Sequence, residues 1–113
     1  MTNTSIKKFI INKLGFDPEN ESECLKAVKQ DEYSIRYIKN PSKEVQLEAI
    51  KRSGWSIQYI KNPSKEAQLE AVKQYGYSIQ LIKNPSKEMQ LLAVKQNGSS
   101  IRFIKNPPDL FNL

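Results

Sequence analysis

The sequence predicts an all-α protein, a short right-handed α-solenoid of four 22-residue repeats with an N-terminal capping helix. Three observations support this fold class. Residues 41–62, 63–84 and 85–106 repeat one another, and the middle copy matches each neighbour at 16 of 22 positions. An Asn-Pro pair recurs at each boundary, and the strict alternation of apolar and polar residues that marks a strand is absent from the sequence.

The repeats read PSKEVQLEAIKRSGWSIQYIKN, PSKEAQLEAVKQYGYSIQLIKN and PSKEMQLLAVKQNGSSIRFIKN. A degenerate copy, ENESECLKAVKQDEYSIRYIKN, precedes them at 19–40. We refer to 19–40, 41–62, 63–84 and 85–106 as units one to four. The predicted organisation is a capping segment at 1–18, the four-unit array at 19–106 and a tail at 107–113.

The first predicted element is a helix over residues 5–14. Ile6, Phe9, Ile10 and Leu14 recur at helical spacing, and Gly15 follows them. Terminal repeats of a stacked array need a cover because their outer face has no neighbour. We therefore expect this helix to lie across unit one.

Each unit then predicts a long helix. The residue before a proline favours the extended conformation of an N-cap, and proline is favoured at the first helical position. Asn40-Pro41 therefore predicts a helix start, as Asp17-Pro18 does in unit one. Gly54 predicts its end, in the left-handed conformation common after a helix. Gly76 and Gly98 are the equivalents of Gly54, and Glu32 replaces it in unit one.

A second, short helix follows, SIQYIK in unit two, with Ser56 as the expected N-cap and a partly 3₁₀ geometry. Trp55 and Ile60 have the spacing of a hydrophobic staple. The apolar residues of the long helix cover a wide arc, so each unit is expected to bury them between two neighbours. These residues are Val45, Leu47, Ala49 and Ile50, and the short helix adds Ile57, Ile60 and the series Tyr37, Tyr59, Leu81 and Phe103.

The tail begins as a fifth unit with Pro107-Pro108. Leu110, Phe111 and Leu113 could fold back over the last unit or pair with another chain. The expected state is a monomer or a weak homodimer through the C-terminal edge.

The pattern AVKQ-x-G…SIxxIKNPS resembles short α-repeats of uncharacterised bacterial and bacteriophage proteins. It is also similar to leucine-rich-repeat-variant and HEAT-like α-solenoids. The resemblance covers 19–106 and implies binding of a macromolecule, with no catalytic motif to carry over. It makes plausible an inhibitor encoded by a phage or mobile element and directed against a host protein such as a defence nuclease.

The amino-acid composition limits the catalytic and metal-binding chemistry that the chain can perform. The 113 residues contain no histidine and one cysteine, Cys24. Ser-His or Cys-His catalysis, a Cys/His zinc site and an internal disulfide are therefore excluded or nearly so. We expect no enzyme, catalytic residue, metal or cofactor. The longest apolar run is Phe9-Ile10-Ile11, so no membrane span is expected. A lone thiol favours a cytoplasmic location.

The net charge is +6, with 18 basic and 12 acidic side chains. Lysine, isoleucine and asparagine fill 36 positions, so codon bias explains part of the lysine content. One lysine series, Lys29, Lys51, Lys73 and Lys95, falls where a helix dipole favours a cation. A second lysine series has two possible explanations: stabilisation by a helix dipole, or a ridge of positive charge that binds phosphates. Its members are Lys39, Lys61, Lys83 and Lys105.

Two further series occupy equivalent positions. Gln46, Gln68 and Gln90 lie within the apolar arc, which predicts a polar ladder in which each side chain bonds the connecting loop of an adjacent unit. A buried, inert Cys24 is expected at the same position of unit one. Tyr33, Trp55 and Tyr77 share a position beside the variable turn that contains Tyr75.

An aromatic, non-uniform edge suits a protein hot spot. The expected function is thus a non-catalytic protein-binding module that occupies a surface of its partner. The alternative is a nucleic-acid-binding solenoid that uses the lysine ridge. The candidate contact residues are Tyr33, Trp55, Tyr75, Tyr77, Lys61, Lys83 and Lys105.

Overall fold

The computed structural model describes residues 3–105 and 107. Helices account for 73% of these residues, and no strand occurs among them. The long helices are α1 (Asn3–Leu14), α2 (Glu21–Gln30), α3 (Lys43–Arg52), α4 (Lys65–Gln74) and α5 (Lys87–Gln96). The 3₁₀ helices are η1 (Glu32–Tyr37), η2 (Gly54–Tyr59), η3 (Gly76–Leu81) and η4 (Gly98–Phe103).

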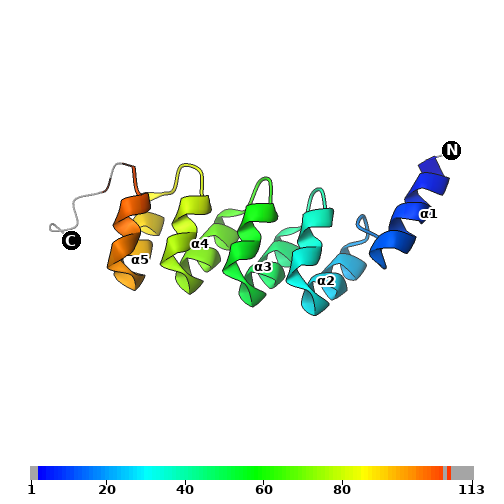
Figure 1. Ribbon diagram of the computed structural model, residues 1–113, viewed down its shortest axis with the longest axis horizontal. Helices are drawn as coiled ribbons and strands as arrows, with labels where there is room; N and C mark the ends of the chain where they lie inside the picture. The colour runs from blue at the N-terminus through cyan, green and yellow to red at the C-terminus, as the bar shows by residue number, and fades with distance from the viewer. Residues whose placement is uncertain (1–2, 106, 108–113) are drawn as a thin grey trace.

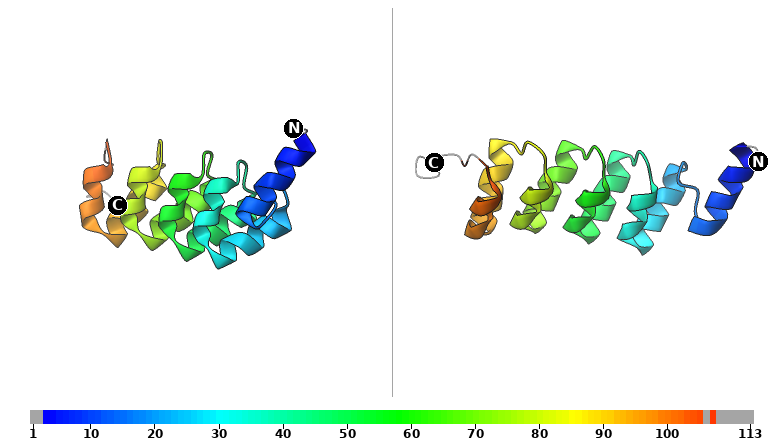
Figure 2. Two further views of the ribbon diagram at one scale, coloured as in Figure 1. Left: turned by 45° about the vertical axis from the view of Figure 1, so that its right-hand side comes forward. Right: turned by 45° about the horizontal axis from the view of Figure 1, so that its top comes forward.

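Helices α2 to α5 stand side by side in one row, and η1 to η4 form a second row beside it (Figure 1). Within each row a helix packs against its neighbours in sequence order, and each η helix also packs against an adjacent α helix. The molecule measures 60 × 24 × 18 Å, so it is much longer than it is wide (Figure 2). The sequence prediction of an all-α chain is confirmed.

Serine, rather than the asparagine before proline, caps α3, α4 and α5, and in unit one Asn20, rather than the predicted Asp17, caps α2. The Ser42 hydroxyl accepts a hydrogen bond from the Val45 N–H at 3.2 Å, and Ser64 and Ser86 do the same in the next units. The predicted start at Asn40-Pro41 is therefore two residues too early. Serine is the N-cap because its side chain accepts a hydrogen bond from one of the free N–H groups of the first turn, which the asparagine before proline does not do.

The glycine that follows each long helix does not have the predicted left-handed conformation. Ser53 and its equivalents cap the helix ends in an extended conformation, and Gly54 begins η2 without a positive φ. The reason for glycine is the close approach of the next unit. A Cβ on Gly76 would lie 2.6 Å from the Ala93 carbonyl oxygen. Among the described glycines only Gly15, after α1, has a positive φ, of 83°.

Ser56 is also not the N-cap of the short helix, because η2 already begins at Gly54. Ser56, Ser78 and Ser100 are instead fully buried, with no hydrogen-bond partner for their hydroxyl groups. Their small size lets adjacent units approach, since the Ser100 hydroxyl oxygen would lie 2.8 Å from a Cβ on Gly76.

The core runs along the interface between the two rows. The predicted apolar positions Val45, Ala49, Ile50, Ile57 and Ile60 are all buried, and Leu47 is partly buried against them. The prediction that the tyrosines of the short helix join this core is wrong. Tyr37 and Tyr59 are 48% and 38% exposed, and Leu81 and Phe103 are partly buried. Leu81 and Phe103 pack against the core, as predicted.

Helix α1 does not lie across unit one as the predicted cap. It packs against none of the described α or η helices, and Ile6, Phe9 and Ile10 stay exposed (Figure 1). The Leu14 and Phe16 side chains, at the end of α1 and just beyond it, reach the core instead. Leu110, Phe111 and Leu113 of the predicted tail lie outside the described residues.

Candidate protein-binding face

Aromatic side chains of the η row contact one another from unit to unit. The Tyr33 and Tyr59 rings meet edge to face with centroids 5.8 Å apart, and Tyr77 meets Phe103 in the same way at 5.5 Å. In each pair the first ring precedes the second by one unit. Leu81 occupies the equivalent position in unit three, so Trp55 has no such partner there.

Trp55 instead stacks on Tyr75, which comes from the turn before η3. The two ring centroids are 6.3 Å apart, and the ring planes differ by 21°. Tyr75 is 49% exposed, so one face of this stack meets solvent. Tyr75, from the variable turn, and Trp55, from the aromatic series of the preceding unit, thus form one stacked aromatic pair.

Two arginines lie over these rings. The Arg102 guanidinium is 5.5 Å from the centroid of Tyr77 and 4.9 Å from that of Phe103, and Arg36 is 4.8 Å from that of Tyr37. An arginine held over an aromatic ring keeps its charge and offers a flat, weakly hydrated group to a partner. We call this surface the aromatic face: Tyr33, Tyr37, Trp55, Tyr59, Tyr75, Tyr77, Phe103, Arg36 and Arg102.

The candidate lysines follow the ends of the η helices. Lys61, Lys83 and Lys105 are exposed, and each follows an η helix by two residues. Lys61 and Lys105 therefore come two residues after Tyr59 and Phe103, and Phe103 and Lys105 line one groove. The structure brings Tyr33, Trp55, Tyr75 and Tyr77 onto the aromatic face and places the lysine series along its border.

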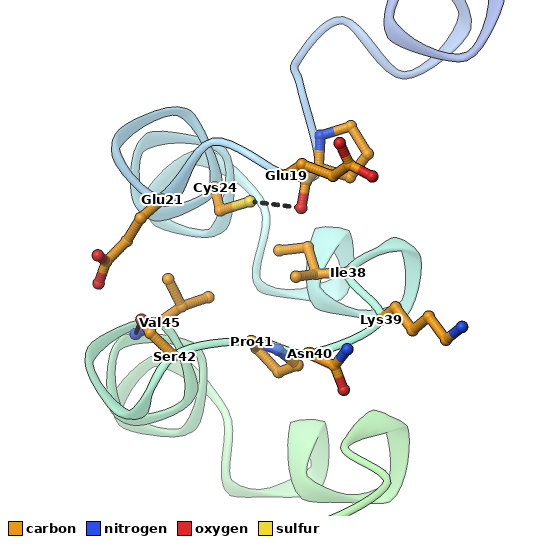
Figure 3. A pocket seen from close by; sticks show the side chains of 10 residues that line it. Glu19, Glu21, Cys24, Ile38, Lys39, Asn40, Pro41, Ser42 and Val45 are labelled. Carbon is orange, nitrogen blue, oxygen red and sulfur yellow. Dashed lines mark hydrogen bonds between the residues drawn. The ribbon is translucent and has the colours of Figure 1, made fainter. Parts of the chain in front are cut away.

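The connecting loops line shallow grooves between units. One, of about 320 Å³, lies between units one and two, with the Glu19, Glu21 and Lys39 side chains around it (Figure 3). Cys24 lies inside it, where its thiol donates to the Pro18 carbonyl oxygen at 3.3 Å. Burial, assisted by the nearby Asp17, raises the pKa of this thiol above its ordinary value, which opposes formation of the nucleophilic thiolate.

The glutamine series bonds to the loops. The Gln46 amide donates to the Pro41 carbonyl oxygen at 3.0 Å, and its own oxygen accepts from the Ser64 N–H of the next unit at 2.8 Å. Gln68 and Gln90 donate to Pro63 and Pro85 in the same way. Within the described part of the chain, Gln46 alone thus bonds the loop of an adjacent unit, as predicted, whereas Gln68 and Gln90 bond the loop that opens their own unit.

Sequence reasoning missed a second glutamine series. The Gln74 amide donates to the Ile50 carbonyl oxygen of the preceding unit at 2.6 Å, and Gln96 donates to the Lys73 carbonyl oxygen. It also missed Tyr59, Arg36 and Arg102 as surface residues. Their signal was present in the sequence, because Arg36 and Arg102 precede the aromatic residues Tyr37 and Phe103 in equivalent units.

Two further searches cover the described part of the chain. No group of three or more cysteine or acidic side chains is arranged to hold a metal ion there. No helix there has the length and apolar character needed to cross a bilayer. Comparison of the chain with protein-family models, with curated proteins and with solved structures finds no match.

Proposed function

We propose that the chain is a right-handed α-solenoid of four 22-residue units that binds another protein through its aromatic face. It has no catalytic role of its own and acts by occupying a surface of its partner, as an inhibitor does. The observation that carries the proposal is a set of three aromatic pairs, Tyr33–Tyr59, Trp55–Tyr75 and Tyr77–Phe103. Each pair joins two consecutive units, so together the pairs link all four units.

Protein hot spots are rich in tryptophan, tyrosine and arginine, which are the residue types of this face. Their large, amphipathic side chains bury much apolar area at a small cost in side-chain entropy. Here ring–ring contacts and two overlying arginines already restrict several of the side chains before binding. Such preorganisation lowers the entropy lost on binding and so supports affinity.

Tyr33, Tyr37, Tyr59 and Tyr75 are between 38% and 49% exposed. Large exposed aromatic side chains that follow one another along a single face are unusual on a soluble monomer. The lysine series has a simpler explanation, since its members are exposed just after the η helices, where a helix dipole already favours a cation. The aromatic face therefore supports protein binding better than the lysines support phosphate binding.

Affinity capture with matched variants tests the proposal. The immobilised chain is exposed to nuclease-treated lysate of the native host, beside the double variant W55A/Y75A and the triple variant K61E/K83E/K105E. We expect the wild type and the lysine variant to retain the same protein, and W55A/Y75A to lose it. Each truncation should cost about 2 kcal/mol or more if these residues are hot spots. Circular dichroism must first show that W55A/Y75A keeps its helices.

Trp55, the single tryptophan, then gives a direct readout, because burial against a partner shifts its emission to shorter wavelength. A nanomolar gel shift with random duplex DNA or RNA, with a steep dependence on salt and lost in K61E/K83E/K105E, would overturn the proposal. That result would favour the nucleic-acid alternative, since phosphate contacts weaken strongly as salt rises.

A further inference from the structure

Among the described residues, each end of the array presents one half of the contact that joins consecutive units. At one position of the η helices, Ile35, Ile57 and Ile79 are 0%, 2% and 1% exposed, but Ile101 is 41% exposed. Val94 is likewise half-buried where Val28, Ile50 and Val72 are fully buried. In units one to three the following unit covers these residues, and no described unit follows unit four.

The glycines show which groups normally close this surface. Around Gly76, the nearest atoms to an added Cβ are the Ala93 carbonyl oxygen, the Ser100 hydroxyl oxygen and the Gln96 amide oxygen, at 2.6, 2.8 and 3.1 Å. All three belong to unit four, which packs on unit three. Around Gly98 nothing lies within 4 Å. We call Val94, Gly98 and Ile101 the C-terminal end face.

The complementary surface is present at the other end. Ala27, Gln30 and Ser34 of unit one hold the positions of Ala93, Gln96 and Ser100. They line an open groove of about 380 Å³, together with Phe16, Glu23, Asp31 and neighbouring residues. We call it the N-terminal groove. The end of α1 forms a wall of this groove and does not fill it.

One polar side chain of the groove, Gln30, lacks the hydrogen bond that its equivalents make. Gln74 and Gln96 each donate to a carbonyl oxygen of the preceding unit, but the side chain of their equivalent, Gln30, is exposed and makes no hydrogen bond. Ser34 is only half-buried, whereas Ser56, Ser78 and Ser100 are 0% exposed. Unit one therefore retains the donor and the small side chain that a preceding unit would meet.

Charge favours the same pairing. Unit one has five acidic and four basic side chains, a net charge of −1, and unit four has one acidic and four basic side chains, a net charge of +3. Glu23, Asp31 and Lys26 line the groove, which gives its lining a net charge of −1. Docking of α1 onto the end face is disfavoured by comparison, because α1 carries Lys7, Lys8 and Lys13 and would bring like charges together.

We propose that the C-terminal end face of one chain docks into the N-terminal groove of a second copy. The contact repeats the packing of unit on unit that occurs three times within the chain. It joins two different surfaces, so it is heterologous and extends into head-to-tail oligomers rather than closing as a symmetric dimer. The continuous series of units would also lengthen the aromatic face, with Tyr37 of the second copy following Ser99 of the first.

Sedimentation velocity of the full chain over a wide concentration range tests the proposal. We expect the average mass to rise with concentration and the association to weaken as salt rises. The variant I101E should weaken association at least about tenfold, a change of about 1.4 kcal/mol. Its matched control is I10E, because Ile10 is also 41% exposed but lies on α1. I10E should associate like the wild type.

A mixing experiment identifies the geometry. Q30W obstructs the groove and keeps the end face, and I101E does the reverse; both changes are at exposed positions, so both chains should stay folded. Each variant alone should be monomeric, and an equimolar mixture should give a 1:1 dimer of about twice 13.0 kDa. The proposal is overturned if the wild type stays monomeric up to millimolar concentration, if I10E rather than I101E abolishes association, or if Q30W still associates with itself.

Discussion

Units three and four are identical at 16 of 22 positions, yet their surroundings differ. Unit three is enclosed by a neighbour on each side, and unit four has a described neighbour on one side only. As a result Ile79 is 1% exposed and the equivalent Ile101 is 41% exposed. In this molecule the burial of a residue is decided by the following unit as much as by its own sequence.

The difference teaches where the stability of the array resides. A single unit cannot enclose its own apolar residues, so most of the stabilisation lies in the contacts between units. Substitutions at equivalent positions should then have unequal effects in units three and four. Pairs of such variants measure the contribution of one interface with the local sequence held nearly constant.

The largest contrast is expected at the buried isoleucine. Ile79→Ala removes methyl groups from a closed interface and should lower the free energy of unfolding by about 3 kcal/mol, within the usual range for such truncations. Ile101→Ala should cost less than about 1 kcal/mol, because the side chain already meets solvent. Urea denaturation followed by circular dichroism measures both values, with the chain dilute enough to be monomeric. Equal losses in the two variants would contradict this account.

A second contrast separates the three interface glycines. An added Cβ on Gly76 meets a backbone oxygen at 2.6 Å, so Gly76→Ala should cost about 2 kcal/mol through overpacking. On Gly54 the nearest contact is the edge of the Tyr75 ring at 3.2 Å, and the cost should be smaller. Gly98→Ala meets nothing and should stabilise the chain by about 0.4–1 kcal/mol, since alanine restricts the unfolded chain.

The midpoints of thermal unfolding should follow the same order, with Gly98→Ala highest and Gly76→Ala lowest. These glycines do not have a positive φ, so conformational strain contributes nothing to the order. Three equal shifts would show that backbone freedom, rather than the approach of the next unit, explains the glycines.

The period, the two helices per unit and the apolar positions of the long helix could be predicted from the sequence. Repetition makes each of these signals visible several times, as at Val45, Ala67 and Met89, which are all buried. Details that depend on the neighbouring unit could not be predicted. The roles of Gly76 and Ser78 follow from how closely two units approach, and the local sequence around each suggested a helix cap instead.

The candidate face was predictable in composition but not in geometry. The sequence placed Tyr33, Trp55 and Tyr77 in one series and Tyr59 and Phe103 in another, with the second assigned to the core. The structure joins the two series, because a ring that begins one η helix contacts a ring near the end of the next. Such a diagonal contact depends on the offset between units, which the spacing within a unit does not reveal.

A third contrast concerns the glutamines that join units. Gln74→Ala removes the bond to the Ile50 carbonyl oxygen and should cost about 1 kcal/mol, the net value of a typical hydrogen bond. Gln30→Ala, at the equivalent position of unit one, removes no hydrogen bond and should leave the free energy of unfolding unchanged within about 0.5 kcal/mol. Denaturant midpoints at matched protein concentration compare the two, and a loss at Gln30 equal to that at Gln74 would rule out the interface bond as the cause.

The smallest change in the free energy of unfolding is expected at the buried serines, where the sign of the change is the informative result. The Ser78 hydroxyl is fully buried and has no hydrogen-bond partner, so the folded state bears the cost of removing it from water. Ser78→Ala deletes that oxygen without adding volume and should stabilise the chain by up to about 1 kcal/mol. Ser34→Ala, at the half-buried equivalent in unit one, should change nothing measurable. If Ser78→Ala were instead destabilising, the hydroxyl would be forming a hydrogen bond in solution. The serine would then be retained for that bond rather than for the small volume that lets two units approach.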